Sequence, residues 1–490
     1  MAKDINWKPT IGLEIHAELR TKTKMFCSCK NDADEKRPNV NICPICMGHP
    51  GTLPVINKGA VKHVLKVGLS VGGKLADFSE FDRKNYFYPD IPKGYQISQY
   101  KHPLVSGGEL LGVGITRVHL EEDTARSAHL SGGDSEKLDN GDYSLLDFNR
   151  AGVPLMELVT EPVMHSSSEV VKFGEELQLL LQYLGVAEAN MEKGEMRLEA
   201  NISIAPLRSD LEKSPKGQTL GTKVEVKNLN SFRSAERAIE YEIKRQAELL
   251  EGGGKINQET RGWDDKKQVT FSQRSKEDSH DYRYFPDPDL PKLKLSEIEE
   301  FSEKTLRQEI KETPKEKRER FKALYNIKES DIGFYISNKK LGAMFEEAAS
   351  NLADKKDFQL LSNFIVSDIA SFGEGGLSIN SKHLATLISM FASGEVSSRG
   401  AKDILVKMPD SNQDPKTIAE KEGLFQKSNE EELIKIANGI IDQNKEAVLE
   451  YKNGKISALQ FLIGQGMKAT KGSANPQILT GVFEKLLKNL

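Results

Sequence analysis

Apolar and polar residues alternate in several short segments of the first 290 residues, which is the pattern of half-buried strands. The clearest segment is TIGLEIHAEL, residues 10–19, in which every second position is apolar. Its other side carries Glu14, His16 and Glu18, because successive side chains of a strand point to opposite faces. The segments GITRVHLEED, MRLEANISI and TKVEVKNLN alternate in the same way. This region is therefore expected to be rich in strands.

Two longer segments of the same region have the apolar spacing of helices. Residues 167–185 end at Gly185, a favoured residue at a helix C-terminus, and residues 231–254 end at three consecutive glycines. Strands mixed with two helices predict an α+β domain. The Gly-, Asp- and Ser-rich residues 131–142 are expected to form a long hairpin connection.

Helical patterns dominate after residue 291. Ser296 and Glu299 have the spacing of a capping box, and Thr313 followed by Pro314 marks another helix start. The C-terminal segment SANPQILTGVFEKLLKNL begins a last helix in the same manner, with Pro476 at its first position. The chain is therefore expected to end in helical structure.

This change of pattern divides the 490 residues into three expected domains. We predict an α+β domain over residues 1–292, a helical domain over 293–410 and a small tail domain over 411–490. Residues 451–490 contain six lysines and a single acidic residue, Glu484. The tail is a candidate for phosphate contacts, although a solvated lysine-rich face is the alternative.

The overall composition is that of an ordinary soluble protein, with 38% hydrophobic residues, 29% charged residues and a net charge of -4. A chain with this charge meets nucleic acid only through a local basic patch. We find no apolar run long enough to span a membrane and no apolar secretory core at the N-terminus. A cytoplasmic location is therefore expected.

All four cysteines fall between residues 27 and 46, as the pairs Cys27-x-Cys29 and Cys43-Pro-Ile-Cys46. A cytoplasmic protein keeps its thiols reduced, which disfavours disulfides. Two close pairs of thiolates suit tetrahedral Zn²⁺, so a zinc knuckle is predicted here. Four protein ligands leave no open position, and the metal would be structural. A redox-active pair and a chance grouping remain as alternatives.

Acidic residues recur beside histidine in two of the predicted strands. RVHLEEDTARS, residues 117–127, places three acids in succession, beginning with Glu121 and Glu122. Adjacent carboxylates repel one another, and either a divalent cation or solvent relieves the repulsion. Solvent is the commoner answer for such a run, but the second acidic row at Glu14 and His16 strengthens the case for a metal site. A solvated sheet face remains the alternative.

Basic residues in two further segments are candidates for phosphate contacts. FDRKNYFYPDIPKGYQISQ, residues 81–99, is an aromatic and proline-rich loop that contains Arg83 and Lys84. TKVEVKNLNSF carries Glu225 and Lys227 and leads into a helix, whose first N–H groups attract anions. The sequence has no P-loop. An ATP site in this chain would therefore depend on Mg²⁺ held by carboxylates and histidine.

Taken in order, eight segments resemble the successive motifs of GatB, a subunit of aspartyl/glutamyl-tRNA amidotransferase, and thus of the GatB/GatE family. They are IGLEIHAEL, CPICMGHPGTLPVIN, FDRKNYFYPDIPKGYQISQ, HLEEDTARS, DFNRAGVPLMELVTEP, EVKNLNSF, DYRYFPDPDLP and MKATKGSANP. The resemblance covers essentially the whole chain. It implies a cradle-shaped α+β catalytic domain with a mixed sheet, then an all-helical domain and a YqeY-like helical tail that contacts tRNA.

The resemblance also implies a reaction and its partners. An amidase subunit, GatA, releases ammonia from glutamine, and a small subunit, GatC, completes a heterotrimer. GatB itself uses ATP and Mg²⁺ to phosphorylate the side-chain carboxylate of Glu on tRNA(Gln) or of Asp on tRNA(Asn). Ammonia then displaces phosphate and gives Gln-tRNA(Gln) or Asn-tRNA(Asn). The enzyme is thus expected to be a glutamine-dependent carbon–nitrogen ligase.

The motif matches carry the family's site residues onto this chain. The expected catalytic residues are acids and one histidine: Glu14, His16, Glu121, Glu122 and Glu225. All of these except the last are expected to bind Mg²⁺. The basic residues expected at the ATP phosphates are Arg83, Lys84 and Lys227. Two lysines of MKATKGSANP are expected to contact tRNA: Lys468 and Lys471.

Two other functions remain as alternatives. A non-catalytic tRNA-binding or assembly subunit would leave the acidic rows solvated and would support no tRNA-dependent ATP hydrolysis. A free-standing ATP-dependent ligase would take ammonia directly and would work with ammonium salts in the absence of an amidase subunit.

Overall fold

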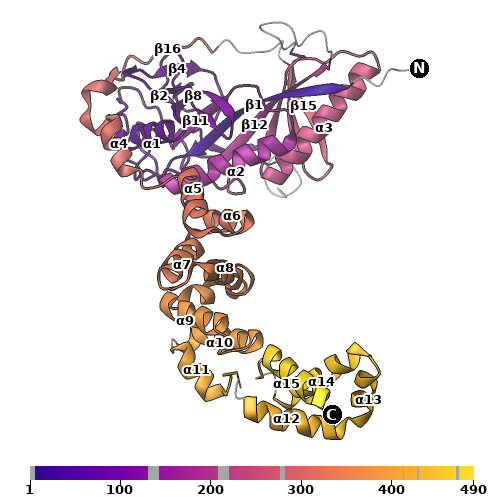
Figure 1. Ribbon diagram of the computed structural model, residues 1–490. Coiled ribbons are helices and arrows are strands. Elements are labelled where there is room, and N and C mark those ends of the chain that lie inside the picture. The colour runs from indigo at the N-terminus through magenta and orange to yellow at the C-terminus, as the bar shows by residue number, and fades with distance from the viewer. Residues whose placement is uncertain are drawn as a thin grey trace, which may run out of the picture. The chain divides into compact units, whose positions relative to one another are not determined.

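The computed structural model describes residues 6–130, 143–207, 220–275, 282–411, 413–426, 430–470 and 474–489. The chain separates into two compact units, Met1–Pro314 and Lys315–Leu490. Figure 1 shows the sheets in the first unit and helices throughout the second. The predicted order, a mixed α+β region followed by helices, is confirmed. The domain boundaries at 292 and 410 stay predictions, and the connection expected at 131–142 lies outside the described residues.

A ten-stranded sheet forms the centre of the first unit. Its strands are Trp7–Glu18 (β1), Lys74–Leu75 (β2), Val105–Ser106 (β6), Glu109–Leu110 (β7), Val113–Glu122 (β8), Pro154–Thr160 (β11), Met196–Pro206 (β12), Val224–Leu229 (β13), Glu259–Asp264 (β14) and Val269–Ser275 (β15). They follow the order β15, β14, β13, β12, β1, β11, β8, β6, β2, and β7 pairs with β8. The pair β13–β14 is parallel and the others are antiparallel, so the sheet is mixed.

The two faces of this sheet carry different side chains. Ile11, Leu13 and Ile15 of β1 belong to a fully buried apolar core. Three helices pack against that face: Lys58–Ser70 (α1), Ser167–Leu184 (α2) and Phe232–Glu251 (α3). Burying one such side chain stabilises the fold by roughly 1.5–3 kcal/mol, so a one-residue slip of β1, which exchanges its faces, is strongly disfavoured. The register therefore fixes the polar residues of β1 on the opposite face.

The predicted helices of the first unit are confirmed, and polar side chains cap their N-termini. Ser166 Oγ accepts a hydrogen bond from Glu169 N at 3.2 Å where α2 begins. Gly185 ends the same helix in the left-handed conformation, with φ of 66°. Ser231 Oγ accepts from Ser234 N at 3.0 Å where α3 begins. Local sequence signals thus set these boundaries.

The helix start expected at Ser296 is wrong. Leu295–Glu297 and Glu299–Phe301 form two short 3-10 turns, and the α-helix Glu303–Glu309 (α4) begins after them. Ser302 is its N-cap, since its Oγ accepts from Thr305 N at 3.3 Å. A serine further along the chain therefore competes successfully for the cap.

The described residues of the first unit also form three small sheets. One combines Phe285–Pro286 (β16), Asp82–Asn85 (β4) and Tyr95–Ser98 (β5), in that order. The others pair Arg126–Leu130 (β9) with Tyr143–Asp147 (β10), and Phe78–Ser79 (β3) with Leu293–Lys294 (β17).

The regular secondary structure described in the second unit is helical, apart from an isolated β-bridge between Val396 and Phe425. Its α-helices, with the one that leads into it, are Pro314–Tyr325 (α5), Glu329–Ser337 (α6), Lys339–Ser350 (α7), Phe358–Ser367 (α8), Ser381–Ala392 (α9), Ser398–Ser411 (α10), Pro415–Glu422 (α11), Glu430–Gln443 (α12), Lys445–Lys452 (α13), Ile456–Ala469 (α14) and Pro476–Asn489 (α15). Helices α12 to α15 enclose an apolar core of their own. The predicted start of the last helix is confirmed, because Asn475 Oδ1 accepts from Gln477 N at 3.0 Å.

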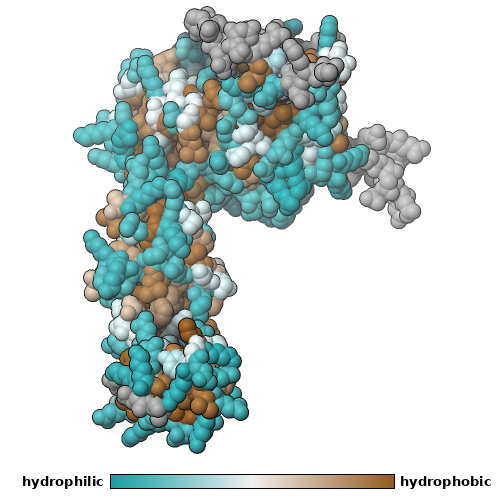
Figure 2. All heavy atoms as spheres, turned by 45° about the vertical axis from the view of Figure 1, so that its right-hand side comes forward, coloured by the Kyte–Doolittle hydropathy of each residue, from teal (hydrophilic) through white to brown (hydrophobic). Residues whose placement is uncertain are grey.

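Hydrophobic residues also reach the surface among hydrophilic ones on the visible face of both units (Figure 2). In the second unit, three apolar side chains are each at least 60% exposed: Val406, Leu449 and Ile456. Scattered apolar residues of this kind are normal on protein surfaces. Among the helices described, none is both long enough and apolar enough to cross a bilayer.

Candidate functional site

The polar face of the central sheet gathers acids and histidines from five strands. The register pairs His16 of β1 with Glu157 of β11, and Glu157 with His119 of β8. On the other side of β1, Glu14 pairs with Glu199 of β12. Directly paired residues of neighbouring strands point to the same face and lie about 5 Å apart. We call the group that these residues form with Glu121 and Glu225 the sheet cluster.

His16 lies at the centre of the sheet cluster. Its Nε2 is 3.4 Å from Glu121 Oε1, 3.4 Å from Glu157 Oε2 and 3.9 Å from Glu14 Oε1. His119 Nε2 lies 3.3 Å from the same Glu157 oxygen. Glu121, Glu157 and His119 are buried, whereas the side chain of Glu14 is 33% exposed. Solvent and ligands therefore reach the cluster on the Glu14 side.

A second set of carboxylates adjoins Glu14. One oxygen each of Glu14, Glu199 and Glu225 lies within 4.8 Å of the others. Lys227 Nζ is 2.8 Å from Glu199 Oε2 and 3.8 Å from Glu225 Oε1. Thr260 Oγ1 donates to Glu225 Oε2 at 2.6 Å. Glu225 and Lys227 thus both face the cluster, as residues two positions apart on β13 must.

Burial and mutual charge shift the ionisation of these groups. Burial and the charge of Glu157 raise the pKa of Glu14 to about 7. Burial disfavours the protonated form of His16, yet its hydrogen bonds with Glu121 and Glu157 raise its pKa well above the usual value. Burial also disfavours ionised Glu157, but His119 and His16 lower its pKa. Imidazolium and carboxylate charges therefore balance one another. A divalent cation can take the place of the protons on Glu14 and His16.

The sheet cluster has the donors of a divalent-cation site. Three overlapping sets have one ligand atom per residue within 4.8 Å: Glu14, His16 and Glu157; His119, Glu121 and Glu157; and Glu14, Glu199 and Glu225. Mg²⁺ prefers oxygen donors, whereas imidazole is more typical of transition metals and Zn²⁺. The set made only of carboxylates is therefore the best match to Mg²⁺.

Of the two neighbouring basic residues on β4, the structure brings only Lys84 to the sheet cluster. Burial opposes the charge of Lys84, but the nearby carboxylate of Glu121 raises its pKa. The side chain of Arg83 points to the other side of the strand. Its Nε lies 2.8 Å from Asp287 Oδ2, and its Nη2 lies 2.8 Å from Asp289 Oδ2. Lys84 therefore lies beside the sheet cluster and Arg83 does not, because adjacent strand residues face opposite ways.

Glu122 does not join the sheet cluster either. It follows Glu121 on β8 and points to the other face, where its carboxylate pairs with Lys93 and accepts a hydrogen bond from Ile97 N at 2.9 Å. Its side chain is 7% exposed. The geometry therefore gives Glu122 an ion-pair partner of its own and leaves it outside the three candidate ligand sets.

Three members of the cluster are absent from the predicted site residues: His119, Glu157 and Glu199. Glu157 is the single charged residue of the apolar strand PLMELVT. Glu199 lies in MRLEANISI, whose alternation predicts a strand. An acid inside an otherwise apolar strand is a usable signal, because burying an unpaired carboxylate is costly.

The four cysteines form a second group of donor atoms, here called the cysteine group. One Sγ of each lies within 4.8 Å of the other three. Cys46 Sγ is 3.8 Å from Cys43 Sγ and accepts a hydrogen bond from Cys43 N at 3.1 Å. A hydrogen bond from Cys27 and the charge of Lys24 lower the pKa of Cys46 to about 5. Four sulfur atoms in one place match a closed tetrahedral Zn²⁺ site.

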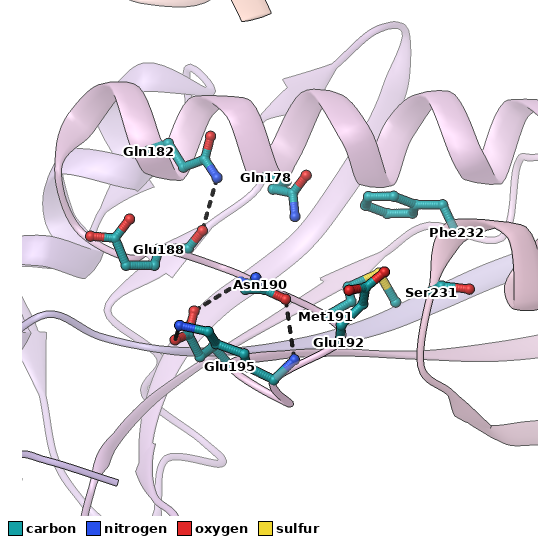
Figure 3. Close-up of a pocket in the computed structure, with 10 residues that line it drawn as sticks. Gln178, Gln182, Glu188, Asn190, Met191, Glu192, Glu195, Ser231 and Phe232 are labelled. Atoms are coloured by element: carbon teal, nitrogen blue, oxygen red, sulfur yellow. Dashed lines mark hydrogen bonds and ion pairs between the residues drawn. The ribbon is translucent and has the colours of Figure 1, made fainter. Parts of the chain in front are cut away.

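A polar pocket of about 410 Å³ lies apart from both groups, between α2, residues 186–195 and the start of α3 (Figure 3). Gln182 Nε2 donates to Glu188 O at 2.9 Å, and Asn190 N donates to Glu195 Oε2 at 3.1 Å. Polar groups of the lining residues thus form hydrogen bonds with one another. No residue of the sheet cluster lines the pocket, so it is not part of that site.

The two lysines predicted to contact tRNA lie in the second unit. Lys468 is exposed in the last turn of α14. Lys471 lies outside the described residues. An exposed lysine at a helix C-terminus is also favoured by the helix dipole, so its position alone does not identify a ligand.

Comparisons with known proteins match nearly the whole chain. The GatB/GatE catalytic domain matches residues 9–300, and the GatB domain matches residues 343–487. Three relatives are each named as the same subunit of aspartyl/glutamyl-tRNA(Asn/Gln) amidotransferase. The protein of Dehalococcoides mccartyi is 43% identical over 98% of this chain and 99% of its own. Those of Thermoanaerobacter pseudethanolicus and Moorella thermoacetica are 41% and 42% identical, each over 99% of this chain and over 100% and 99% of their own.

Proposed function

Because this chain belongs to the GatB/GatE family of aspartyl/glutamyl-tRNA amidotransferase subunits, we propose that it activates misacylated tRNA for amidation. In this proposal ATP phosphorylates the side-chain carboxylate of Glu-tRNA(Gln) or Asp-tRNA(Asn). Ammonia then displaces phosphate and forms Gln-tRNA(Gln) or Asn-tRNA(Asn). The assembled enzyme is thus a glutamine-dependent carbon–nitrogen ligase.

The observation that carries the proposal is the convergence of the sheet cluster. A carboxylate is a poor electrophile with a poor leaving group, and phosphorylation supplies a better one. The reaction brings a carboxylate and a triphosphate together, so it needs positive charge at one place. A group of acids able to hold a divalent cation, with Lys84 and Lys227 beside it, supports this chemistry.

The residues divide the work by their position. A bound Mg²⁺ would neutralise negative charge on the phosphate groups during the transfer. Glu14, Glu199 and Glu225 offer oxygen ligands on the accessible side of the cluster. Lys227, held 2.8 Å from Glu199, and Lys84 supply ammonium groups for ATP phosphates.

The other residues of the cluster orient and balance this set. His16 and Glu121 lie 3.4 Å apart and are candidate ligands of a second cation. Buried Glu157 lies within 3.4 Å of both His16 and His119, which fixes the two rings. We leave Glu122 out of the metal set because its carboxylate is committed to Lys93.

We further propose that this chain acts with other subunits. Its four cysteines all belong to the cysteine group, so no cysteine remains as a nucleophile for releasing ammonia from glutamine. An amidase subunit, GatA, and a small subunit, GatC, fill that need in a heterotrimer. The name of the relatives, which calls each of them one subunit of a tRNA amidotransferase, supports such an assembly.

Structural Zn²⁺ and tRNA contacts complete the proposal. The cysteine group would hold Zn²⁺, within a cradle domain over residues 1–292. Lys468 and Lys471 would contact tRNA from a tail over residues 411–490, behind a helical domain over 293–410. These domain limits remain part of the proposal.

The test is tRNA-dependent ATP hydrolysis by the assembled enzyme on Glu-tRNA(Gln) and Asp-tRNA(Asn). The wild-type enzyme is expected to hydrolyse ATP only with a misacylated tRNA, and Glu14→Gln is expected to lose both hydrolysis and amidation while still binding tRNA. Glu188→Gln serves as the matched control, because Glu188 is 59% exposed and pairs with Arg20 away from the cluster. Absence of ATP hydrolysis in the wild type supports a non-catalytic role, and full activity with ammonium salts but no amidase supports a free-standing ligase.

A further inference from the structure

Lys24 is a fully buried lysine next to the cysteine group. Its relative exposure is 0%, and it is among the largest completely buried side chains of the described residues. Lys24 Nζ donates to Phe148 O at 3.0 Å and lies 3.9 Å from Cys46 Sγ. No carboxylate of the described residues forms an ion pair with this ammonium. The structure therefore buries a cation whose nearby partners are one carbonyl and one sulfur.

Burying an ammonium without a negative partner costs several kcal/mol, so this placement requires a compensating charge. A backbone carbonyl supplies only a dipole. Four thiolates around one divalent cation, by contrast, leave an excess of negative charge on the sulfur atoms. The ammonium of Lys24 lies beside Cys46 Sγ, where such an excess of negative charge would be.

We propose that Lys24 is the built-in counter-charge of a metal–tetrathiolate centre, which makes it a positioning residue for the metal. The inference rests on the zinc site proposed above and is independent of the amidation reaction. In this arrangement Lys24 Nζ donates to Cys46 Sγ in a charge-assisted hydrogen bond. Its effect is to hold Cys46 as a thiolate and to slow the loss of the metal.

Backbone contacts show how Lys24 is fixed between the two cysteine pairs. Lys24 N donates to Cys29 O at 3.0 Å, which ties its backbone to the first pair. Its side chain runs past Gly152, where an added Cβ would lie 3.6 Å from both Lys24 Cδ and Cys46 Cβ. Lys24 therefore contacts both pairs as well as the segment that contains Phe148 and Gly152.

That segment also holds the loop that leads to the second cysteine pair. Asn149 Oδ1 accepts hydrogen bonds from Val40 N and Asn41 N, both at 2.9 Å, just before Cys43. The carbonyl next to Asn149 is the one that Lys24 binds. The ammonium thus joins the metal ligands to the backbone that positions them, which is the usual role of groups that surround a metal's ligands.

The first experiment compares metal release from the full-length chain and from two variants. Lys24→Met keeps the length of the side chain and removes its charge, and Lys22→Met, at an exposed lysine two residues away, is the matched control. Each protein is loaded with Zn²⁺, its metal content is measured, and transfer of Zn²⁺ to a chromogenic chelator is followed. We expect Lys24→Met to release Zn²⁺ about 10–100-fold faster and Lys22→Met to match the wild type. Release of Zn²⁺ from Lys24→Met at the wild-type rate overturns the proposal.

The melting temperature separates a charge effect from a packing effect. The loss of Tm caused by Lys24→Met is expected to be large in the Zn²⁺-loaded protein and to shrink or reverse after the metal is removed. An equal loss with and without metal means that Lys24 only fills space, and it overturns the proposal. A wild-type chain that binds no metal overturns the zinc site and this inference together, whatever its activity.

A measurement on the wild type covers the case in which Lys24→Met does not fold. A lysine-reactive reagent is applied to the chain with and without Zn²⁺, and the modified sites are found by mass spectrometry. We expect Lys24 to become reactive only after removal of the metal, because its ammonium then loses the negative charge that balances it. Exposed Lys22 should react equally in both states, and equal protection of Lys24 in both states overturns the proposal.

Discussion

The cysteine group and the sheet cluster are both sets of metal-ligating side chains, but they are built in opposite ways. The cysteine group comes from one stretch, residues 27–46, whose ligands lie close in sequence. The sheet cluster takes its residues from β1, β8, β11, β12 and β13, which lie far apart along the chain. One arrangement depends on local loop geometry, and the other exists only when a large sheet has the correct register.

The two groups also differ in what surrounds them. The four sulfur donors of the cysteine group fill the positions of a tetrahedral metal and leave none open for a substrate. A buried lysine lies beside them. The sheet cluster offers more donors than one ion needs, together with the partly exposed Glu14. A closed set of soft donors suits a structural metal, and an open set of oxygen donors suits catalysis. Removal of one ligand should therefore affect folding in the first group and reaction rate in the second.

The largest expected effect is on catalysis, from Glu121→Gln. Glu121 Oε1 lies 3.4 Å from His16 Nε2, and the substitution removes its charge while keeping its shape. We expect tRNA-dependent amidation to fall at least ~100-fold, on the order of 3 kcal/mol of transition-state stabilisation, with little change in Tm. The steady-state rate of formation of amidated tRNA and the thermal unfolding of the same samples measure the two quantities. A large fall in Tm with normal amidation would give the sheet cluster a structural role and end the contrast.

The second effect is on stability, from Cys43→Ser in the cysteine group. Loss of one of four ligands should abolish Zn²⁺ binding and remove several kcal/mol of stability, because binding free energy of a structural metal is folding free energy. Metal analysis and chemical denaturation measure the two consequences. Ser28→Ala is the control, since Ser28 is an exposed residue between two of the cysteines. A variant that keeps its stability but loses amidation would place the cysteine group among catalytic elements.

A smaller effect is expected from Glu122→Gln, which sharpens the comparison within one strand. Glu122 neighbours Glu121 but faces Lys93 and Ile97 N on the other side of the strand. Removing its charge leaves Lys93, whose side chain is 13% exposed, without an ionised partner, so we expect a loss of about 1–3 kcal/mol of unfolding free energy. Divalent-cation affinity at the sheet cluster, measured by calorimetry, should not change. A fall in that affinity as large as that of Glu121→Gln would return Glu122 to the metal set.

The same contrast explains which residues of the two groups can be predicted from the sequence alone. Period-two alternation is a local property, so Glu14 and His16 on one face of β1 are predictable from ten residues. Glu157 and Glu199 join them only through pairing between strands, and no short segment contains that register. Spacing alone groups the four cysteines, but it does not indicate Lys24, because lysine is expected at the surface.

Adjacent residues illustrate a further limit of sequence reasoning. The pairs Glu121–Glu122 and Arg83–Lys84 each look like one functional unit, yet a strand sends their members to opposite faces. One member of each pair enters the sheet cluster and the other finds a separate partner. The helix start misplaced at Ser296 has a related origin, because Ser296 and Ser302 offer the same capping signal and the helix begins after the second of them.

The smallest effect expected is a pH dependence that the sheet cluster shows through Glu14. Burial and the charge of Glu157 raise the pKa of Glu14 to about 7, so this carboxyl is mostly protonated at pH 6 and mostly ionised at pH 8. A cation binds the ionised form, and its affinity should therefore rise by about ten-fold over this interval. The raised pKa of His16 acts in the same direction, because a metal displaces its proton. Calorimetric titration with Mg²⁺ at several pH values tests this, and Glu14→Gln should bind more weakly with a flatter profile. An affinity that falls as pH rises would mean that the protonated carboxyl takes part in binding, and Glu14 would not act as an ionised ligand.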